Sequence, residues 1–247
     1  MPSISAVIIT YNAERRLAQC LASLQGIADE TVVLDAYSTD QTQAICRQFA
    51  NVRISTQAFT TYAQQKNDAI ALAQHRYILS LDADEVLSNE LRAQIIQAKQ
   101  QWDYDAYAFS RRNYCGDYWV RYGGWYPDRK IRLFDREKAR WAGGNPHEYL
   151  SLDTDARLGR LSGDLLHYTA DTLADWIARN ERYSTLQAEY LAHSRPRVSY
   201  YTLFVKPFWR FIRAYLLQGG FLDGKIGFIA AVTAAYGVFA RYAKLYR

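Results

Sequence analysis

Short hydrophobic runs recur through the first third of the chain, and each ends in polar residues. They lie at residues 4–10, 30–36 and 76–82, with a weaker run at 52–57. Their nearly continuous apolar character is typical of parallel strands that are covered on both faces of a sheet. Between the first two runs, the spacing i, i+3, i+4, i+7 predicts a helix that packs on this sheet, through Leu17, Cys20, Leu21 and Leu24. We therefore expect an α/β fold with a mostly parallel central sheet flanked by helices.

The second half of the chain follows a different pattern. Two strand-like pieces, at 106–114 and 130–136, flank a segment rich in glycine and aromatic residues, a composition that suits an adaptable binding loop on a rigid sheet. Helical spacing returns at about 173–191, and Pro196 is expected to interrupt the helical structure after this segment. These changes predict a main domain over residues 1–194 and a helical extension over residues 195–247.

The extension combines aromatic and basic residues. On a helix, Phe204, Phe208 and Phe211 would line one side, with basic residues mostly on the others, as in helices that lie in a membrane interface. The apolar run at 226–240 has 15 residues, fewer than the roughly 20 that span a bilayer. We expect a peripheral contact with a membrane. The alternative is that both segments pack on the main domain or on a second copy of the chain.

Composition and charge narrow the class of protein. Of the 247 residues, 49% are hydrophobic and 22% are charged, which excludes a disordered or fibrous chain. The three cysteines form no Cys-x-x-Cys pair, so neither a disulfide framework nor a zinc site is indicated, and the start of the chain lacks the pattern of a secretory signal. A cytoplasmic protein is the expectation.

The charge is distributed unevenly along the chain. The formal net charge is +5, yet nine basic residues and a single acid, Asp223, follow residue 194. A basic extension on a mildly acidic body suggests a partner with phosphates. An anionic membrane surface fits better than nucleic acid, because no recognised nucleic-acid-binding module accompanies the charge.

Polar residues collect where the predicted parallel strands end. The first run continues into Thr10-Tyr11-Asn12, the second into Asp35 with Ser38 and Asp40 behind it, and the last into Asp82, Asp84 and Glu85. Ligands of open parallel sheets bind outside the carboxyl ends of the strands, so these residues predict a binding site. No G-x-G-x-x-G or G-x-x-x-x-G-K loop is present to cradle phosphates.

A divalent cation is the other common means of holding phosphates, through one or two carboxylates of the protein. Asp82 and Asp84 are two residues apart, and on an extended strand end both side chains would point to the same side. The alternative is that Asp84 and Glu85 belong to a turn and favour the N-terminus of the helix that follows. The sequence does not indicate a separate role for Glu85.

Taken in order, these motifs resemble glycosyltransferase family 2, the inverting GT-A enzymes that use nucleotide-sugar donors. The matching strings are "IITYN", "STD" after Asp35, "AQQKNDAI" and "LDADE" as the family's Asp-x-Asp. The strings "GGWYPDRKIRLF", "GGNPHEYL" and "LLHYT" further resemble the lipopolysaccharide-core β-1,4-glucosyltransferases. The chain lacks the Gln-x-x-Arg-Trp signature of processive synthases, which favours the transfer of one sugar per encounter.

The resemblance implies roles for individual residues. On the donor side it implies that uridine, ribose and diphosphate are held by Thr10, Tyr11, Asn12, Asp35, Lys66 and Asp82. Asp84 would coordinate Mg²⁺ or Mn²⁺, and His167 would add a metal or phosphate contact. The metal would neutralise the departing nucleoside diphosphate.

On the acceptor side, the resemblance makes Glu148 the base that takes the proton of the acceptor hydroxyl. The alternatives for Glu148 are a surface glutamate or a partner of Arg132. His147 would orient Glu148 or touch the acceptor. Sugar contacts are expected from Trp125, Tyr126, Asp128 and Arg129. Trp125 alternatively caps the core.

The expected activity is transfer of a hexose, glucose from UDP-glucose, onto a heptose of the lipopolysaccharide inner core at the cytoplasmic membrane face. A family 2 transferase with another donor, acting on a different glycan or lipid-linked acceptor, is the alternative. A nucleotidyltransferase would need a glycine-rich basic loop after the first strand, and "TYNAERRL" has none. A non-catalytic adaptor is disfavoured because Asp35, Asp82, Asp84 and Glu148 are all present.

Overall fold

The computed structural model describes residues 1–145, 147–194 and 198–246. It divides into two compact units that interleave along the chain. The first unit comprises Met1–Arg111 and Arg129–His167, and the second comprises Arg112–Asp128 and Tyr168–Arg247. Pro196, the expected chain break, lies outside the described residues. The functional division expected at residue 194 stays a prediction.

Four parallel strands open the first unit, as the hydrophobic runs predicted. They are β1 (Ile4–Thr10), β2 (Glu30–Asp35), β3 (Val52–Thr56) and β4 (Tyr77–Asp82). Helices α1 (Leu17–Leu24), α2 (Thr42–Cys46) and α3 (Tyr62–Leu72) connect them. β1 pairs in parallel with both β2 and β4, and β2 pairs in parallel with β3. The carboxyl ends of β1, β2 and β4 therefore lie at one edge of the sheet.

Antiparallel strands extend this sheet on the β4 side. They are β5 (Glu85–Leu87), β6 (Ala106–Cys115), β7 (Tyr118–Val120), β8 (Asp128–Asp135) and β11 (Leu158–Ala170). The strand order is β3-β2-β1-β4-β8-β6-β11-β5, with β7 beside β6. Strands β9 (Ala139–Ala142) and β10 (Tyr149–Leu152) form a separate ribbon. The aromatic segment expected as a plain loop thus contains a hairpin strand, β7.

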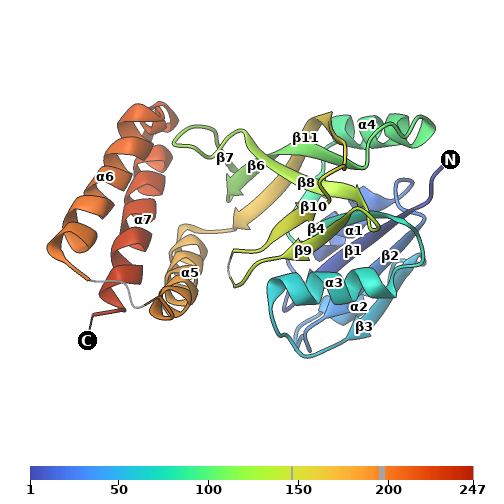
Figure 1. The fold of residues 1–247 in the computed structure, drawn as a ribbon, viewed down its shortest axis with the longest axis horizontal. Coiled ribbons are helices and arrows are strands. Elements are labelled where there is room, and N and C mark those ends of the chain that lie inside the picture. The colour runs from blue at the N-terminus through green and yellow to red at the C-terminus, as the bar shows by residue number, and fades with distance from the viewer. Residues whose placement is uncertain (146, 195–197, 247) are drawn as a thin grey trace. The chain divides into compact units, whose positions relative to one another are not determined.

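Successive side chains of β1 pack into two different hydrophobic cores, one on each face of the sheet. This explains why the strand is apolar at nearly every position. Ile8 packs in the core that contains Leu21 of α1 and Leu91 of α4 (Asn89–Gln100). Val7 packs in the core on the other face, with Ile70 of α3. Helices thus cover both faces of the parallel strands (Figure 1). This is the α/β architecture that the sequence predicted.

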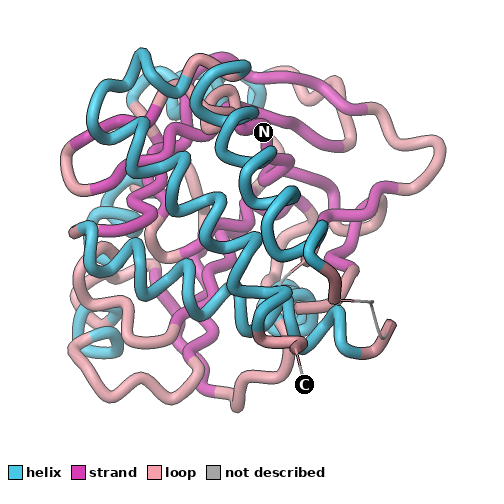
Figure 2. The backbone as a smooth tube through the Cα atoms, turned by 90° about the vertical axis from the view of Figure 1, so that its left-hand side faces the viewer, coloured by secondary structure: helices cyan, strands magenta, loops and turns pink. Residues whose placement is uncertain are grey.

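The second unit is mainly helical. It contains α5 (Leu173–Ala192), the π turns η1 (Tyr201–Val205) and η2 (Arg213–Leu217), α6 (Lys206–Ile212), the 3-10 turn η3 (Gly220–Asp223) and α7 (Gly224–Ala243). α5 begins with a capping box, in which Thr172 and Asp175 satisfy each other's backbone N–H groups. α6 and α7 run side by side (Figures 1 and 2). The helical pattern predicted at 173–191 is therefore confirmed.

Candidate functional site

A buried aspartate holds together the two loops that leave β1 and β2. Asp35 is fully buried, and its carboxylate accepts hydrogen bonds from the Thr10 hydroxyl at 2.9 Å and from the Ser38 backbone N–H at 2.9 Å. The backbone N–H of Asn12 in turn donates to the Ser38 hydroxyl at 2.8 Å. Asp35 therefore fixes the ends of both strands, and Tyr11 stands 64% exposed between them.

Asn12 adds a second tie between these loops. Its side-chain oxygen accepts from the backbone N–H of Thr39 at 2.9 Å, and its own φ is +49°, in the left-handed region that asparagine tolerates better than most residues. The structure thus brings the predicted donor residues Thr10, Asn12 and Asp35 together. Their assignment to nucleotide binding stays a prediction.

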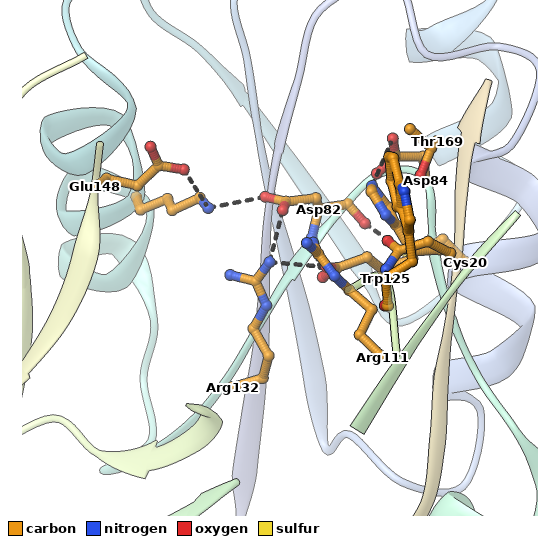
Figure 3. Close-up of polar contacts among 12 residues, drawn as sticks. Cys20, Asp82, Asp84, Arg111, Trp125, Arg132, Glu148 and Thr169 are labelled. Atoms are coloured by element: carbon orange, nitrogen blue, oxygen red, sulfur yellow. Dashed lines mark hydrogen bonds and ion pairs between the residues drawn. The ribbon is translucent and has the colours of Figure 1, made fainter. Parts of the chain in front are cut away.

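At the end of β4, Asp82 lies between two cations (Figure 3). Its Oδ1 is 2.9 Å from Lys66 Nζ, and its Oδ2 is 2.7 Å from a guanidinium nitrogen of Arg132. Burial alone would raise the pKa of Asp82, but the charges of Lys66 and Arg132 outweigh it and hold that pKa well below its ordinary value. Asp82 is therefore an ionised carboxylate with both oxygens engaged.

Glu85, for which the sequence indicated no role, is the buried anchor of this cluster. Its side chain is fully inaccessible, and Oε1 lies 3.0 Å from Arg111 and 2.8 Å from Arg132. Its other oxygen accepts the backbone N–H of Asp82 at 3.0 Å. Glu85 therefore fixes both the strand end that carries Asp82 and the arginine that pairs with it. It is a positioning residue.

A tryptophan packs against the cations of the cluster. Lys66 Nζ lies 4.3 Å from the ring centroid of Trp141, and the Arg132 guanidinium lies 5.5 Å from it. Asn67, next to Lys66 on α3, exchanges two hydrogen bonds with the backbone of Trp141, at 2.9 and 3.1 Å. These contacts fix the end of the lysine side chain in a cation–π arrangement.

Glu148 reaches the same lysine as Asp82. Its Oε1 is 3.5 Å from Lys66 Nζ, and its side chain is 21% exposed. The loop before it is tied to the start of α3, because the backbone N–H of Tyr62 donates to Asn145 at 2.9 Å. Lys66 thus holds one paired carboxylate and one partly open carboxylate. His147, beside Glu148, has an exposed side chain.

Asp84 and His167 form a separate pair. Oδ2 of Asp84 is 3.4 Å from Nε2 of His167, and these side chains are 26% and 6% exposed. Asp84 lies in the turn between β4 and β5, whereas Asp82 ends β4. The expectation that both aspartates point to one side of an extended strand is wrong, because the chain turns between them and the two carboxylates have different partners.

These two side chains determine what kind of metal site the chain could offer. Among the described residues, no group of three or more His, Cys, Asp or Glu side chains is arranged to hold a metal ion. Asp84 and His167 would supply two donor atoms, which suits a Mg²⁺ or Mn²⁺ ion that takes its remaining ligands from phosphates and water. A closed structural site of protein ligands alone does not fit.

Cys20 lies behind this region, where its thiol is 3.8 Å from the backbone oxygen of Asp82. Burial, followed by the negative charges of Glu85, Asp84 and Asp82, raises the pKa of Cys20 well above its ordinary value. The residue is therefore a neutral thiol that packs in the core, and it cannot serve as a nucleophile.

The predicted sugar-binding aromatic residues belong to the second unit. Trp125 packs against the small core around Trp176, whose ring centroid is 5.2 Å away, so the structure supports the alternative that Trp125 caps a core. Tyr126 meets the edge of Trp119 at 5.2 Å. Asp128 is half-buried at the start of β8, and the neighbouring Arg129, in the first unit, is exposed. The sugar contacts expected of these residues stay predictions.

Sequence reasoning missed Arg111 and Trp141 as members of the site, assigned no role to Glu85, and considered Arg132 only as a partner of Glu148. Arg132 carried a usable signal, because it is a charged residue inside the apolar strand "KIRLF". A buried arginine in a strand requires a carboxylate partner. The partners themselves could not be read from the sequence, because they depend on how β6 and β8 join the sheet.

Comparisons with known proteins point to one family. Residues 5–151 match the family model described as Glycosyl transferase family 2. The chain is 31% identical over 255 residues to the lipopolysaccharide core biosynthesis glycosyltransferase LpsC of Rhizobium meliloti, which covers 99% of this chain and 92% of LpsC. An uncharacterized glycosyltransferase of Rickettsia typhi is 29% identical over 257 residues, which covers 99% of this chain and 87% of that protein.

Solved structures add a likeness of fold. The crystal structure of S. aureus TarS 1–349 in complex with UDP-GlcNAc matches with a TM-score of 0.50 and 16% sequence identity, covering 98% of this chain and 92% of the TarS chain. At this identity the match concerns the fold of the backbone.

Proposed function

Because the chain belongs to glycosyltransferase family 2, we propose that it moves glucose from UDP-glucose, with inversion, onto a heptose of the lipopolysaccharide inner core at the cytoplasmic membrane face. Two similarities support this choice. The relative LpsC is named for lipopolysaccharide core biosynthesis, and the TarS fold neighbour is described in complex with UDP-GlcNAc. We therefore propose a nucleotide sugar as the donor.

The observation that carries the proposal is a shared lysine. Lys66 Nζ lies 2.9 Å from Asp82 and 3.5 Å from Glu148, so one buried cation holds a carboxylate at the predicted donor side and a second at the predicted acceptor side. Family 2 chemistry needs these two groups close together, because the acceptor oxygen attacks the sugar carbon that the diphosphate leaves.

Glu148 is the base in this proposal. Its partly exposed carboxylate would accept the proton of the acceptor hydroxyl as the new C–O bond forms and the bond to the diphosphate breaks. Lys66 Nζ, 3.5 Å from Oε1, orients this carboxylate towards the site. Arg132 and Lys66 hold Asp82 in place beside it.

The donor would be held by the ends of β1 and β2. Tyr11 would be available to contact the uracil ring of the donor, and Asp35 would fix the two loops. Asp84 and His167 would hold a Mg²⁺ or Mn²⁺ ion, which when bound neutralises charge on the departing diphosphate. His147, Trp125, Tyr126, Asp128 and Arg129 remain the proposed contacts of the acceptor.

Release of UDP tests this function. The full chain is incubated with Mg²⁺ or Mn²⁺, deacylated or intact lipopolysaccharide core, and a panel of nucleotide sugars. We expect UDP release with UDP-glucose that depends on the acceptor. Faster turnover with another donor, or with another lipid-linked glycan, would replace the named substrates. Absence of turnover with every donor would count against the catalytic assignment as a whole.

Glu148→Gln separates catalysis from binding. We expect kcat to fall about 10²- to 10⁴-fold while the Kd for UDP, measured by calorimetry, stays within a factor of about 3. The matched control is Glu137→Gln, at a side chain that is 63% exposed and pairs with Arg76. If Glu148→Gln keeps the turnover of the control, Glu148 is not the base.

A further inference from the structure

Helices α6 and α7 of the second unit bury mainly small residues and expose several large apolar ones, although Tyr242 of α7 is also buried. Around α6, the buried positions are Thr202, Pro207 and Ala214. Phe204 and Phe208 are 62% and 66% exposed in the same stretch. A helix on the surface of a soluble protein normally turns its large apolar side chains inward. Here that relation is inverted.

α7 repeats the inversion. Its buried positions include Gly227, Ala230 and Ala231, whereas Phe228 and Val232 are exposed. A Cβ atom at Gly227 would lie 1.8 Å from the backbone oxygen of Gly220, so the close approach of these segments requires a residue without a side chain. Helices that pack through small residues and turn bulky apolar ones outward are characteristic of proteins in contact with lipid.

We define the apolar set as six large apolar side chains of this stretch that are each at least half exposed: Phe204, Phe208, Trp209, Leu216, Leu217 and Phe221. One of them, Trp209, directly precedes Arg210 in the sequence. Exposed apolar side chains of this number and size exceed what a monomeric soluble surface carries without a partner.

The charge around the apolar set identifies the partner. Between residues 198 and 246, the only acid is Asp223, and its carboxylate is buried and accepts the backbone N–H groups of Arg121 and Tyr122 at 2.9 and 2.8 Å. The bases of this stretch are Lys206, Arg210, Arg213, Lys225, Arg241 and Lys244. An apolar surface on a stretch that carries six bases and a single, buried acid is complementary to an anionic lipid bilayer.

Three of these bases crowd one another. Burial, together with the charges of Arg213 and Arg241, lowers the pKa of Arg210. Such a group of guanidinium cations is stabilised by anions from outside the chain. Lipid phosphates would supply them at the depth where the adjacent aromatic rings meet the headgroups.

The same helices bear on whether the chain spans the bilayer. Within the described residues, the segment Gly220–Ala243 has 24 residues and includes a stretch of 18 residues with a mean hydropathy of 1.4, enough by length and composition to cross a membrane. Length alone therefore does not exclude a span, because the helical segment extends beyond the apolar run at 226–240, and the expected peripheral contact stays a prediction.

Polar contacts along α7 nevertheless oppose a spanning arrangement. Its Thr233 backbone oxygen accepts from Asn180 at 3.0 Å, and its Tyr236 hydroxyl donates to Glu181 at 2.9 Å. Glu181 also pairs with Lys244 at 2.6 Å. A spanning α7 would either break these contacts or carry the charged residues of α5 into hydrocarbon, and both are costly.

We infer that the second unit binds anionic bilayers by lying in the interface, with the apolar set inserted below the headgroups and Arg210, Arg213 and Lys225 at phosphate level. This membrane binding extends the proposed function, and its biological role rests on that function, in which the acceptor is part of a membrane lipid. Binding is measured without donor or acceptor, so failure of membrane binding and failure of sugar transfer remain distinguishable.

Vesicle flotation with the full chain tests the inference. We expect the protein to float with vesicles of one-third phosphatidylglycerol in phosphatidylcholine and to bind pure phosphatidylcholine at least tenfold more weakly. The triple variant Phe204→Ser, Phe208→Ser and Leu217→Ser should lower binding at least tenfold while the circular dichroism spectrum is unchanged. The control Ile96→Ser, at a 44% exposed position of α4 in the first unit, should bind as the parent chain does.

A second variant tests the same inference if the triple variant misfolds. Arg213→Gln with Lys225→Gln should weaken binding to anionic vesicles severalfold and reduce its salt dependence. Equal binding by the parent chain to neutral and anionic vesicles would overturn the inference. So would a stable dimer in analytical ultracentrifugation that the triple variant abolishes, or retention in cell membranes after washing at high pH, which would indicate spanning.

Discussion

Replacement of Glu85 by glutamine should destabilise the protein severely, although it only exchanges one carboxylate oxygen for an NH₂ group. The carboxylate is fully buried and meets Arg111 at 3.0 Å, Arg132 at 2.8 Å and the backbone N–H of Asp82 at 3.0 Å. A glutamine can offer its oxygen to the two arginines, but its NH₂ group then faces the N–H of Asp82. If it is flipped, the NH₂ group faces two guanidinium cations.

The magnitude follows from the charge that is left behind. Removing one partner of a buried ion pair costs about 3–5 kcal/mol, because the other charge stays buried without compensation. Arg132 keeps Asp82 as a second partner at 2.7 Å, so we expect the lower end, about 3 kcal/mol. With a urea m value of about 3 kcal/mol/M for a chain of this size, the midpoint should fall by about 1 M.

Urea unfolding provides the assay, followed by tryptophan fluorescence and far-UV circular dichroism so that separate unfolding of the two units is visible. The exposed Glu90→Gln on α4 is the control and should stay within about 0.5 kcal/mol. Adding Arg111→Gln to Glu85→Gln should cost less than the sum of the single changes, since the two side chains interact directly at 3.0 Å. A loss below about 1 kcal/mol for Glu85→Gln, or strict additivity of the pair, would refute the reasoning.

Three other changes test neighbouring parts of the site. His167→Ala should raise the Mg²⁺ or Mn²⁺ concentration for half-maximal UDP release about 10- to 100-fold, and an unchanged metal dependence would remove His167 from the proposed ion site. Trp141→Leu should lower stability by about 1–2 kcal/mol in the same unfolding assay through the lost cation–π contacts, with Trp102→Leu as an aromatic control away from the cluster. Because the pKa of Asp82 is lowered on folding, its stabilising contribution is complete above about pH 4 and is lost as the pH falls further towards the folded-state pKa. Asp82→Asn should therefore flatten the stability curve below about pH 4, and an unaltered acid limb would contradict the assigned ion pairs.

The sequence predicted the parallel half of the fold well, because the information there is local. Continuous apolar runs identified β1, β2 and β4, and residues after parallel strands necessarily meet at one edge. That rule alone is enough to predict that Thr10, Asn12 and Asp35 lie together. The same local reasoning failed at Asp84, because a turn of two residues is enough to redirect a side chain.

The buried partners of Asp82 could not be predicted from the sequence, for a different reason. Arg132 enters the cluster because β8 pairs antiparallel with β4, and Glu85 enters it because β5 pairs with β11. Such pairings between distant segments leave no periodic trace in the sequence. The exposed aromatic residues of the second unit were only partly predictable. A stripe of aromatic residues can be proposed from the sequence, but its exposure depends on which small residues pack inside.

The shared lysine has a consequence for the kinetics of substrate capture. Lys66, Arg111 and Arg132 carry three positive charges, and Asp82, Glu85 and Glu148 carry three negative ones, so the ion-pair cluster has no net charge. A neutral cluster projects little field beyond its own contacts, unlike an open pocket of unpaired bases. The association rate of a dianionic donor should therefore depend only weakly on ionic strength, and the collision frequency rather than electrostatic steering would limit how fast the first substrate arrives.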